Sequence, residues 1–261
     1  MRTTRTRSFP YENDEFDIRV GTFDDDGRND DDDKNDDIKE GIGPNDDTLK
    51  GGEGVDALYG EGGDDHIYGG GGTDWLFGNN DQDDLFGEDG SDQLYGGDGN
   101  DFLDGGEESD WLDGGTGTDI LVGGPDGDWL TGGSGYDTFL FNVAGNWYNP
   151  DSPSFNPDTI LDYSSTDDQI VLEGSELVAV PGRYVEDTIA YGAGYDAAEM
   201  HAMSLLDGDK TYAFVTDGVD GYLFIEPWTS LPAIETVGII LEGLTSTSDF
   251  EWHDVMSVSS Y

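Results

Sequence analysis

The chain has 261 residues and a formal net charge of −50, from 60 Asp and Glu against 10 Lys and Arg, and it contains no Cys. This charge excludes a nucleic-acid partner bound through its phosphates, and the lack of Cys excludes disulfides and thiolate metal sites. No segment approaches about 18 consecutive apolar residues, so no transmembrane helix is expected. The length favours one or two domains.

Residues 1–41 form a leader that ends in an acidic tract, Asp24 to Glu40. Its charge density predicts disorder, at least before a cation is present, and it lacks the spacing of an EF-hand. Met1 to Arg7 is basic, as at the start of a signal peptide, but Tyr11 to Asp14 stands where the apolar stretch should follow. No cleaved N-terminal signal is therefore expected.

Nine-residue repeats fill the next segment. Ten consecutive units run from Gly51 to Leu140, and a weaker copy precedes them at Ile42 to Lys50, so residues 42–140 are expected to form one repeat domain. Every unit has Asp at its sixth place and a large apolar residue at its eighth. The sixth places are Asp47, Asp56, Asp65, Asp74, Asp83, Asp92, Asp101, Asp110, Asp119, Asp128 and Asp137. The eighth places are Leu49, Leu58, Ile67, Leu76, Leu85, Leu94, Leu103, Leu112, Leu121, Leu130 and Phe139.

The composition of the unit favours calcium binding. Glycine tolerates positive φ, so a glycine-rich run turns sharply and aims its carbonyls inward. These carbonyls and the Asp carboxylate are hard oxygen ligands, of which Ca²⁺ takes about six to eight. The candidate metal ligands are therefore the sixth-place Asp residues and the glycines of the second and fourth places: Gly52, Gly54, Gly63, Gly70, Gly72, Gly90, Gly97, Gly99, Gly115, Gly117, Gly133 and Gly135.

The period predicts an all-β fold, a right-handed parallel β-roll. The last three residues of each unit should form a strand, with the eighth side chain pointing inward and the seventh and ninth outward. Two units then make one turn, and turns stack at roughly 4.8 Å. Equivalent Asp residues lie 18 positions apart, so two Asp ladders face each other on opposite edges. A cation between successive turns would offset their repulsion, which predicts about eight or nine calcium sites.

The predicted core is one side chain thick, so the roll should fold only when calcium binds. A disordered Gly/Asp-rich tract is the alternative, but disorder does not require a large apolar residue at every ninth position. Asp81, Glu108 and Asp126 replace the fourth-place Gly. Asp adopts left-handed geometry more readily than Glu, so the site around Glu108 is the least secure of the series.

Residues 141–261 are expected to form a mainly β cap with one short helix, because repeat arrays need terminal caps. Residues 149–153 are a loop. The helix is expected near Ala197 to Leu206, with Asp196 as its N-cap and Gly208 as its stop. The predicted strands are residues 159–163, 169–172, 211–215, 221–225 and 237–241.

The repeats resemble the RTX, or haemolysin-type calcium-binding, family. Asp158 to Tyr163, followed by Asp168 to Leu172, is similar to the Asp-x-Ile-x-Asp-Phe…Asp-x-Ile-x-Leu pattern in the C-terminal domain of serralysin-type secreted metalloproteases. The resemblance implies export through a type I secretion channel, an uncleaved C-terminal signal, and folding outside the cell when calcium is met. It also implies that the sixth-place Asp residues and loop carbonyls bind Ca²⁺. Asp158, which begins the serralysin-like segment, is a further candidate metal ligand.

The chain departs from the protease at its catalytic motif. It contains no His-Glu-x-x-His, and its histidines, His66, His201 and His253, do not pair at helical spacing. Gly-x-Ser-x-Gly is also absent. We therefore expect no catalytic residues and no enzymatic activity.

One outer face of the predicted roll collects aromatic side chains: Tyr59, Trp75, Phe77, Tyr95, Trp111 and Trp129. This face either packs under the cap or leader, as an ordinary β surface does, or forms a platform for sugar rings or a partner protein.

The sequence thus predicts a secreted, extracellular calcium-binding protein of a Gram-negative bacterium, non-enzymatic, with an adhesion, surface or glycan-binding role. Its expected partners are calcium, the type I secretion machinery, and an extracellular glycan or surface partner. The alternatives are an RTX exoenzyme, a carbohydrate-binding module of a polysaccharide-modifying enzyme such as an alginate epimerase, and a halophilic protein whose acidity serves salt tolerance.

Overall fold

The computed structural model describes residues 19–20, 38–41, 44–142, 157–173, 184–188, 190–205, 212–225, 237–250 and 255–258. Most of the leader, the loop at residues 149–153, Gly208 and His253 lie outside this part of the chain. The expected disorder of the leader therefore stays a prediction.

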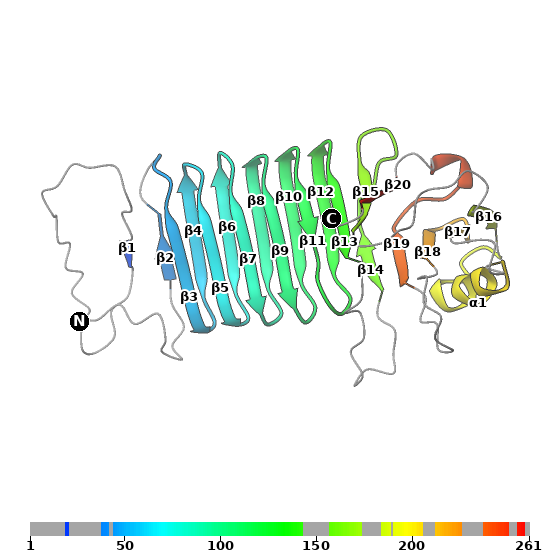
Figure 1. The fold of residues 1–261 in the computed structure, drawn as a ribbon, viewed down its shortest axis with the longest axis horizontal. Coiled ribbons are helices and arrows are strands. Elements are labelled where there is room, and N and C mark those ends of the chain that lie inside the picture. The colour runs from blue at the N-terminus through cyan, green and yellow to red at the C-terminus, as the bar shows by residue number, and fades with distance from the viewer. Residues whose placement is uncertain are drawn as a thin grey trace, which may run out of the picture.

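Two β-sheets stack against each other to form the roll, and both continue into the C-terminal region (Figure 1). Sheet A has the order β1 (Arg19–Val20), β2 (Ile38–Glu40), β4 (Ala57–Gly62), β6 (Trp75–Asn80), β8 (Gln93–Gly99), β10 (Trp111–Gly117), β12 (Trp129–Gly135), β14 (Asp158–Ile160), β19 (Val237–Leu241), β18 (Gly221–Ile225), β17 (Tyr212–Thr216) and β16 (Tyr184–Thr188). Sheet B has the order β3 (Thr48–Gly54), β5 (His66–Gly72), β7 (Asp84–Asp89), β9 (Phe102–Glu107), β11 (Ile120–Val122), β13 (Thr138–Asn142), β15 (Gln169–Glu173) and β20 (Val255–Val258).

The predicted register is confirmed. Strands within each sheet of the roll pair in parallel with an offset of 18 residues, so that Leu58 lies beside Leu76 and Ile67 beside Leu85. All eleven eighth-place side chains, from Leu49 to Phe139, have no exposed surface. The fold is an all-β, right-handed parallel β-roll with these side chains as its core.

Most strands of the roll are longer than the three residues expected for each unit, with β11 as an exception. Strand β5 spans seven residues and continues through the glycines of the following unit, where Gly52 pairs with Gly70 and Gly54 with Gly72. Inward positions therefore alternate between an eighth-place aliphatic and a first-place glycine, as at Ile67 and Gly69, which are both buried. The glycine leaves room for the turn that follows at the edge of the roll.

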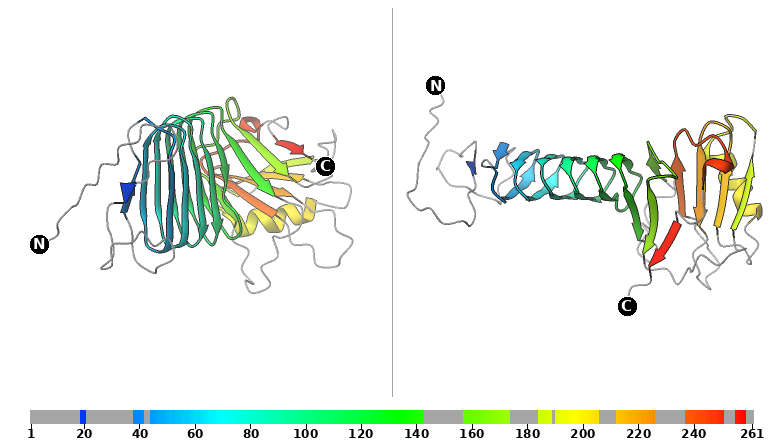
Figure 2. Two further views of the ribbon diagram at one scale, coloured as in Figure 1. Left: turned by 60° about the vertical axis from the view of Figure 1, so that its left-hand side comes forward. Right: turned by 90° about the horizontal axis from the view of Figure 1, so that it is seen from above.

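Both sheets of the roll extend into the cap (Figure 2). Strand β14 pairs in parallel with β12, and β15 pairs in parallel with β13. Ile160 and Ile170 continue the two apolar ladders and are fully buried. The C-terminal region therefore continues both sheets past the last repeat. The first predicted strand ends at Ile160 instead of residue 163, and β16 and β20 were not predicted.

Beyond β19, sheet A becomes mixed, because β18 is antiparallel to its two neighbours whereas β16 pairs in parallel with β17. This part of the sheet builds a separate core. Helix α1 (Tyr195–Leu205) contacts β17 and β18, and small side chains of the helix pack against the sheet. This second core contains Ala198, Ala202, Ala213, Val215, Tyr222 and Phe224.

The predicted start of the helix is wrong. The helix begins at Tyr195, so Asp196 lies within its first turn and is not the N-cap. Gly194 precedes the helix with φ of 78°, and its N–H donates to Asp217 Oδ2 at 2.8 Å. A contact with the β17–β18 connection therefore fixes where the helix starts. In the described part of the chain, no helix is long and apolar enough to span a membrane.

Candidate metal centre

The sixth-place Asp residues lie in two rows along the edges of the roll. The edge A ladder precedes the strands of sheet A and consists of Asp56, Asp74, Asp92, Asp110 and Asp128; the edge B ladder precedes those of sheet B and consists of Asp47, Asp65, Asp83, Asp101, Asp119 and Asp137. None of these eleven side chains is more than 2% exposed. Burial of so many carboxylates in rows is unusual, because an ionised group loses most of its hydration there.

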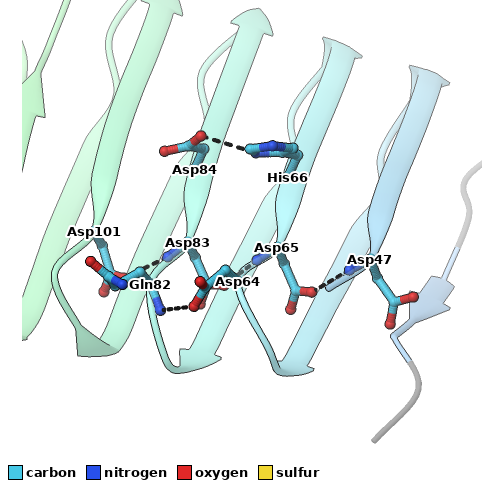
Figure 3. Close-up of polar contacts among 8 residues, drawn as sticks. All are labelled: Asp47, Asp64, Asp65, His66, Gln82, Asp83, Asp84 and Asp101. Carbon is cyan, nitrogen blue, oxygen red and sulfur yellow. Dashed lines mark hydrogen bonds and ion pairs between the residues drawn. The ribbon is translucent and has the colours of Figure 1, made fainter. Parts of the chain in front are cut away.

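In nine of the ladder residues, from Asp65 to Asp137, one carboxylate oxygen holds neighbouring turns together. Asp65 Oδ1 accepts a hydrogen bond from the backbone N–H of Asp47 at 2.7 Å, and Asp83 Oδ1 accepts one from Asp65 at 2.8 Å (Figure 3). The same bond links Asp83 to Asp101 at 2.9 Å and recurs along edge A. Each of these nine Asp residues therefore fixes the register of its turn on the preceding one.

The second oxygen of most ladder residues has no hydrogen-bond donor. Oδ2 is buried and without a hydrogen-bond partner in Asp65, Asp74, Asp83, Asp92, Asp101, Asp110, Asp119, Asp128 and Asp137. A buried polar atom left unsatisfied costs about 1–3 kcal/mol, and more when it is charged. Nine such atoms in regular positions indicate that a cation belongs beside them.

Burial raises the pKa of these carboxyl groups, because desolvation disfavours the charged form. Backbone hydrogen bonds oppose this rise, and neighbouring ladder carboxylates add to it. The pKa is about 6 for Asp74, about 7 for Asp92, about 8 for Asp83 and about 9 for Asp110. A cation between the turns would reverse this balance and keep the carboxylates ionised at neutral pH.

First-place glycines lie directly against the free carboxylate oxygens. A Cβ added to Gly78 would overlap Asp83 Oδ2 and lie 2.7 Å from the carbonyl oxygen of Gly96. The free oxygen and a carbonyl of the next turn therefore border the same space. These glycines were not predicted as site residues, because their role is steric and requires no positive φ. Their position could have indicated it: each lies two residues after a core side chain and therefore on the same, inward face of the strand.

The second- and fourth-place glycines adopt the backbone geometry expected of them. Of the twelve glycines proposed as ligands, all except Gly99 have φ between 97° and 146°. Their assignment as calcium ligands stays a prediction. Non-glycine residues also take positive φ, between 72° and 77°: Asp81, Glu108 and Asp126 at the fourth place, and Glu61, Asn79 and Glu88 at the second. Left-handed geometry costs an L-residue about 1–2 kcal/mol, so these loops tolerate strain.

Carboxylates alone do not complete a site. In the part of the chain that the structure describes, no three His, Cys, Asp or Glu side chains are grouped closely enough to hold a metal ion. The free Asp oxygens fit Ca²⁺, a hard cation that also accepts backbone carbonyls as ligands. Each site would thus combine ladder carboxylates with loop carbonyls.

Asp158, a candidate metal ligand from the sequence, lies at the end of the edge A ladder; its role as a ligand stays a prediction. Its Oδ1 accepts from Asp128 N–H at 3.0 Å, as the ladder residues do, although 30 positions separate the two. Burial and the neighbouring Asp128 carboxylate raise the pKa of Asp158 well above its ordinary value. Asp168 extends edge B in the same way by accepting from Asp137 N–H at 3.2 Å. Asp168 was part of the quoted pattern but was not predicted as a site residue.

These features define a parallel β-roll whose edges are built to bind calcium. The family model for the RTX calcium-binding nonapeptide repeat, which comprises four copies of the repeat, matches residues 42–76, 77–112 and 104–139. The roll therefore consists of RTX calcium-binding nonapeptide repeats, and calcium is its cofactor.

Solved structures with some similarity include two subunits of the mannuronan C5-epimerase from Azotobacter vinelandii. The AlgE6R3 subunit is 25% identical, with 72% of this chain and 80% of that chain covered, at a TM-score of 0.37. The AlgE6R2 subunit is 23% identical, with 75% and 94% covered, at a TM-score of 0.31. No curated protein matches the chain.

Proposed function

We propose that this chain is an extracellular calcium-binding RTX protein that folds when it meets calcium after type I secretion, and that it has no enzymatic activity. The nine buried carboxylate oxygens without donors carry the proposal. Without cations they oppose folding; with cations they join successive turns. Extracellular calcium modules bind at about 10⁻⁴–10⁻³ M, so a roll of this kind stays unfolded at low cytosolic calcium, which favours export.

A calcium titration followed by circular dichroism and native mass spectrometry tests this function. We expect strand signal to rise with calcium, several ions to bind per chain, and chelator to reverse both. Magnesium is the control, because it takes smaller, more regular octahedral sites than Ca²⁺ and should not replace it. Unchanged strand signal in chelator would contradict the proposal.

The non-enzymatic assignment rests on the roles that the prominent carboxylates of the cap already have. Asp158 and Asp168 continue the ladders. Burial acts to raise the pKa of Asp217, but N–H donors from Gly194, Asp220 and Val219 outweigh it and hold the pKa below its ordinary value. The rival function, an exoenzyme or a binding module of a polysaccharide-modifying enzyme, predicts a cleft in residues 141–261 that is lined by carboxylates with perturbed pKa values.

A surface-binding role is a second candidate, favoured by two exposed tryptophans on sheet A. Trp111 and Trp129 are 39% and 43% exposed, and their ring centroids lie 6.4 Å apart. By contrast, Phe77 stacks on Tyr59 at 4.8 Å and on Tyr95 at 5.0 Å with nearly parallel planes. Because these rings cover one another and are less exposed, the tryptophan pair offers more area to a ligand than they do. The negative charge favours an uncharged glycan over an acidic one.

Glycan binding by the calcium-loaded protein tests this second role. We expect the double variant Trp111→Ala/Trp129→Ala to lose binding, and Phe77→Ala to retain it. Equal binding by wild type and the double variant, or binding by neither, removes the candidate.

A further inference from the structure

Two carboxylates lie just past the last repeat and differ from the ladder residues in how their oxygens are used. Both oxygens of Asp162 accept backbone hydrogen bonds, Oδ1 from Gly132 N–H at 2.9 Å and Oδ2 from Gly133 N–H at 2.8 Å. Both oxygens of Asp168 do so as well, from Asp137 N–H at 3.2 Å and from Ser164 N–H at 2.8 Å. Neither residue has an oxygen left without a donor.

Asp162 lies at the place in sheet A where β12 extends beyond the end of its partner strand β14. Strand β12 continues to Gly135, whereas β14, which pairs with it, ends at Ile160. The N–H groups of Gly132 and Gly133 would therefore lack the partner that the next turn supplies elsewhere, as Gly123 O does for Gly106 N–H. Backbone donors require an acceptor, and the Asp162 side chain supplies two acceptor oxygens from beyond the end of the strand.

Asp168 lies at the end of edge B and is less buried than the ladder residues. It keeps the bond that joins a ladder Asp to the preceding turn, but Ser164 N–H donates to its Oδ2. In Asp119 and Asp137, the same oxygen is buried and has no donor. The N–H of Ser164 thus occupies the position beside Asp168 Oδ2 that a cation would occupy beside Oδ2 of a ladder residue.

Edge A ends differently. Asp158 is only 6% exposed, and its Oδ1 accepts from Asp128 N–H, as a ladder residue does for the preceding turn. Asp128 Oδ2 has no donor. Asp158 thus continues the arrangement of edge A, in which a buried carboxylate on each turn has an unsatisfied carboxylate oxygen on the turn before it.

We propose that Asp162 and Asp168 close the roll without metal, so that the calcium series ends at Asp137 on edge B but extends to Asp158 on edge A. The inference rests on the calcium binding proposed above. It assigns opposite roles to acidic residues only a few positions apart: Asp158 is a metal ligand, whereas both oxygens of Asp162 and Asp168 accept from backbone N–H groups.

Native mass spectrometry of the full chain at saturating calcium, combined with thermal melting, tests this assignment. Asp158→Asn should bind one ion fewer than wild type. Asp168→Asn and Asp162→Asn should bind as many ions as wild type, yet lower the Tm by several degrees, by the same amount at every saturating calcium concentration. Asp167→Asn is the matched control, since Asp167 is exposed and accepts only from Ser164 and Thr166 hydroxyls; it should change neither quantity.

Loss of an ion from Asp168→Asn or Asp162→Asn overturns the proposal, and so does an unchanged Tm in both. If Asp162→Asn does not fold, Asp168→Asn still decides, because its amide oxygen can accept from Asp137 N–H. A wild-type chain that binds no calcium contradicts the proposed function instead, which separates the two failures.

Discussion

The roll and the cap share two continuous sheets but are stabilised in different ways. The roll has a core one side chain wide, from Leu49 to Phe139, flanked by rows of buried carboxylates. The cap packs large rings together, as where Phe214 stacks on Phe250 at 4.4 Å, and surrounds its buried Asp217 with donors. Strands that belong to the same two sheets can therefore depend on cations in one region and on apolar packing in the next.

The largest difference between the two regions should follow removal of calcium. In chelator, we expect amide hydrogens of residues 48–140 to exchange at the rate of an unfolded chain, because the ladder carboxylates then repel each other. Amides of β17 and β18, which belong to the second core, should keep measurable protection. Hydrogen exchange with mass spectrometry measures both. Loss of protection in β17 and β18 at the same calcium concentration as in the roll would show one cooperative unit.

Acidity should affect the two regions with opposite sign. The folded-state pKa of Asp74 is about 6 and that of Asp110 about 9, against 3.8 for the free side chain. Their contribution to stability is thus fully present below about pH 3.8 and is lost as the pH rises through 6 to 9. Asp217 has a lowered pKa, so its contribution is present above pH 3.8 and is lost as the pH falls through its folded-state pKa.

We therefore expect the calcium-free roll to gain strand signal as the pH falls from 9 to about 5, whereas the calcium-loaded roll loses calcium over the same range because protons compete for the carboxylates. Circular dichroism in chelator and in calcium measures the two trends. A metal-free chain whose strand signal rises with pH would show that the carboxylates are not buried as the structure has them.

Substitution of one buried Asp in each region should separate metal from backbone partners. Asp110→Asn should destabilise the calcium-loaded protein by about 3 kcal/mol, by analogy with the loss of one partner of a buried ion pair, and should have no effect in chelator. Asp217→Asn should cost about 1–3 kcal/mol through lost hydrogen bonds, at any calcium concentration. Thermal melting across a calcium series measures both, and parallel curves for the two variants would remove the distinction.

Substitution of one glycine in each region should give the smallest difference in stability between the roll and the cap. Gly78→Ala places a methyl group against Asp83 and Gly96, so overpacking should cost about 1–3 kcal/mol and weaken calcium binding. Gly243→Ala, at φ of 75° with open space around it, should cost about 1–2 kcal/mol from backbone geometry alone and leave calcium binding unchanged. A calcium titration of both variants distinguishes these effects.

The periodic part of the molecule was predictable because each residue's environment repeats. Asp at every ninth position was enough to predict the two ladders. The eighth-place side chains were enough to predict the core and the 18-residue register. The details within each loop were less accessible: Glu61 and Asn79 take positive φ at the second place, although neither residue type signals it strongly.

The remaining features depend on contacts between segments far apart in sequence. Asp162 reaches Gly132 across a connection with no period, and Asp217 sets the start of a helix 23 residues away. No local sequence pattern predicts contacts over such separations. Most strands of the cap could therefore be predicted, whereas the side-chain hydrogen bonds that join it to the roll and fix its helix could not.

The tryptophans on sheet A have a practical consequence. Trp111 directly follows Asp110, and Trp129 directly follows Asp128, so each indole is one residue away from a carboxylate that would hold a cation. Indole emission changes with its surroundings, and excited indole transfers energy to a nearby lanthanide that replaces calcium. The chain thus carries its own optical probe at edge A, and filling of the ladder next to the cap can be followed in real time without a label.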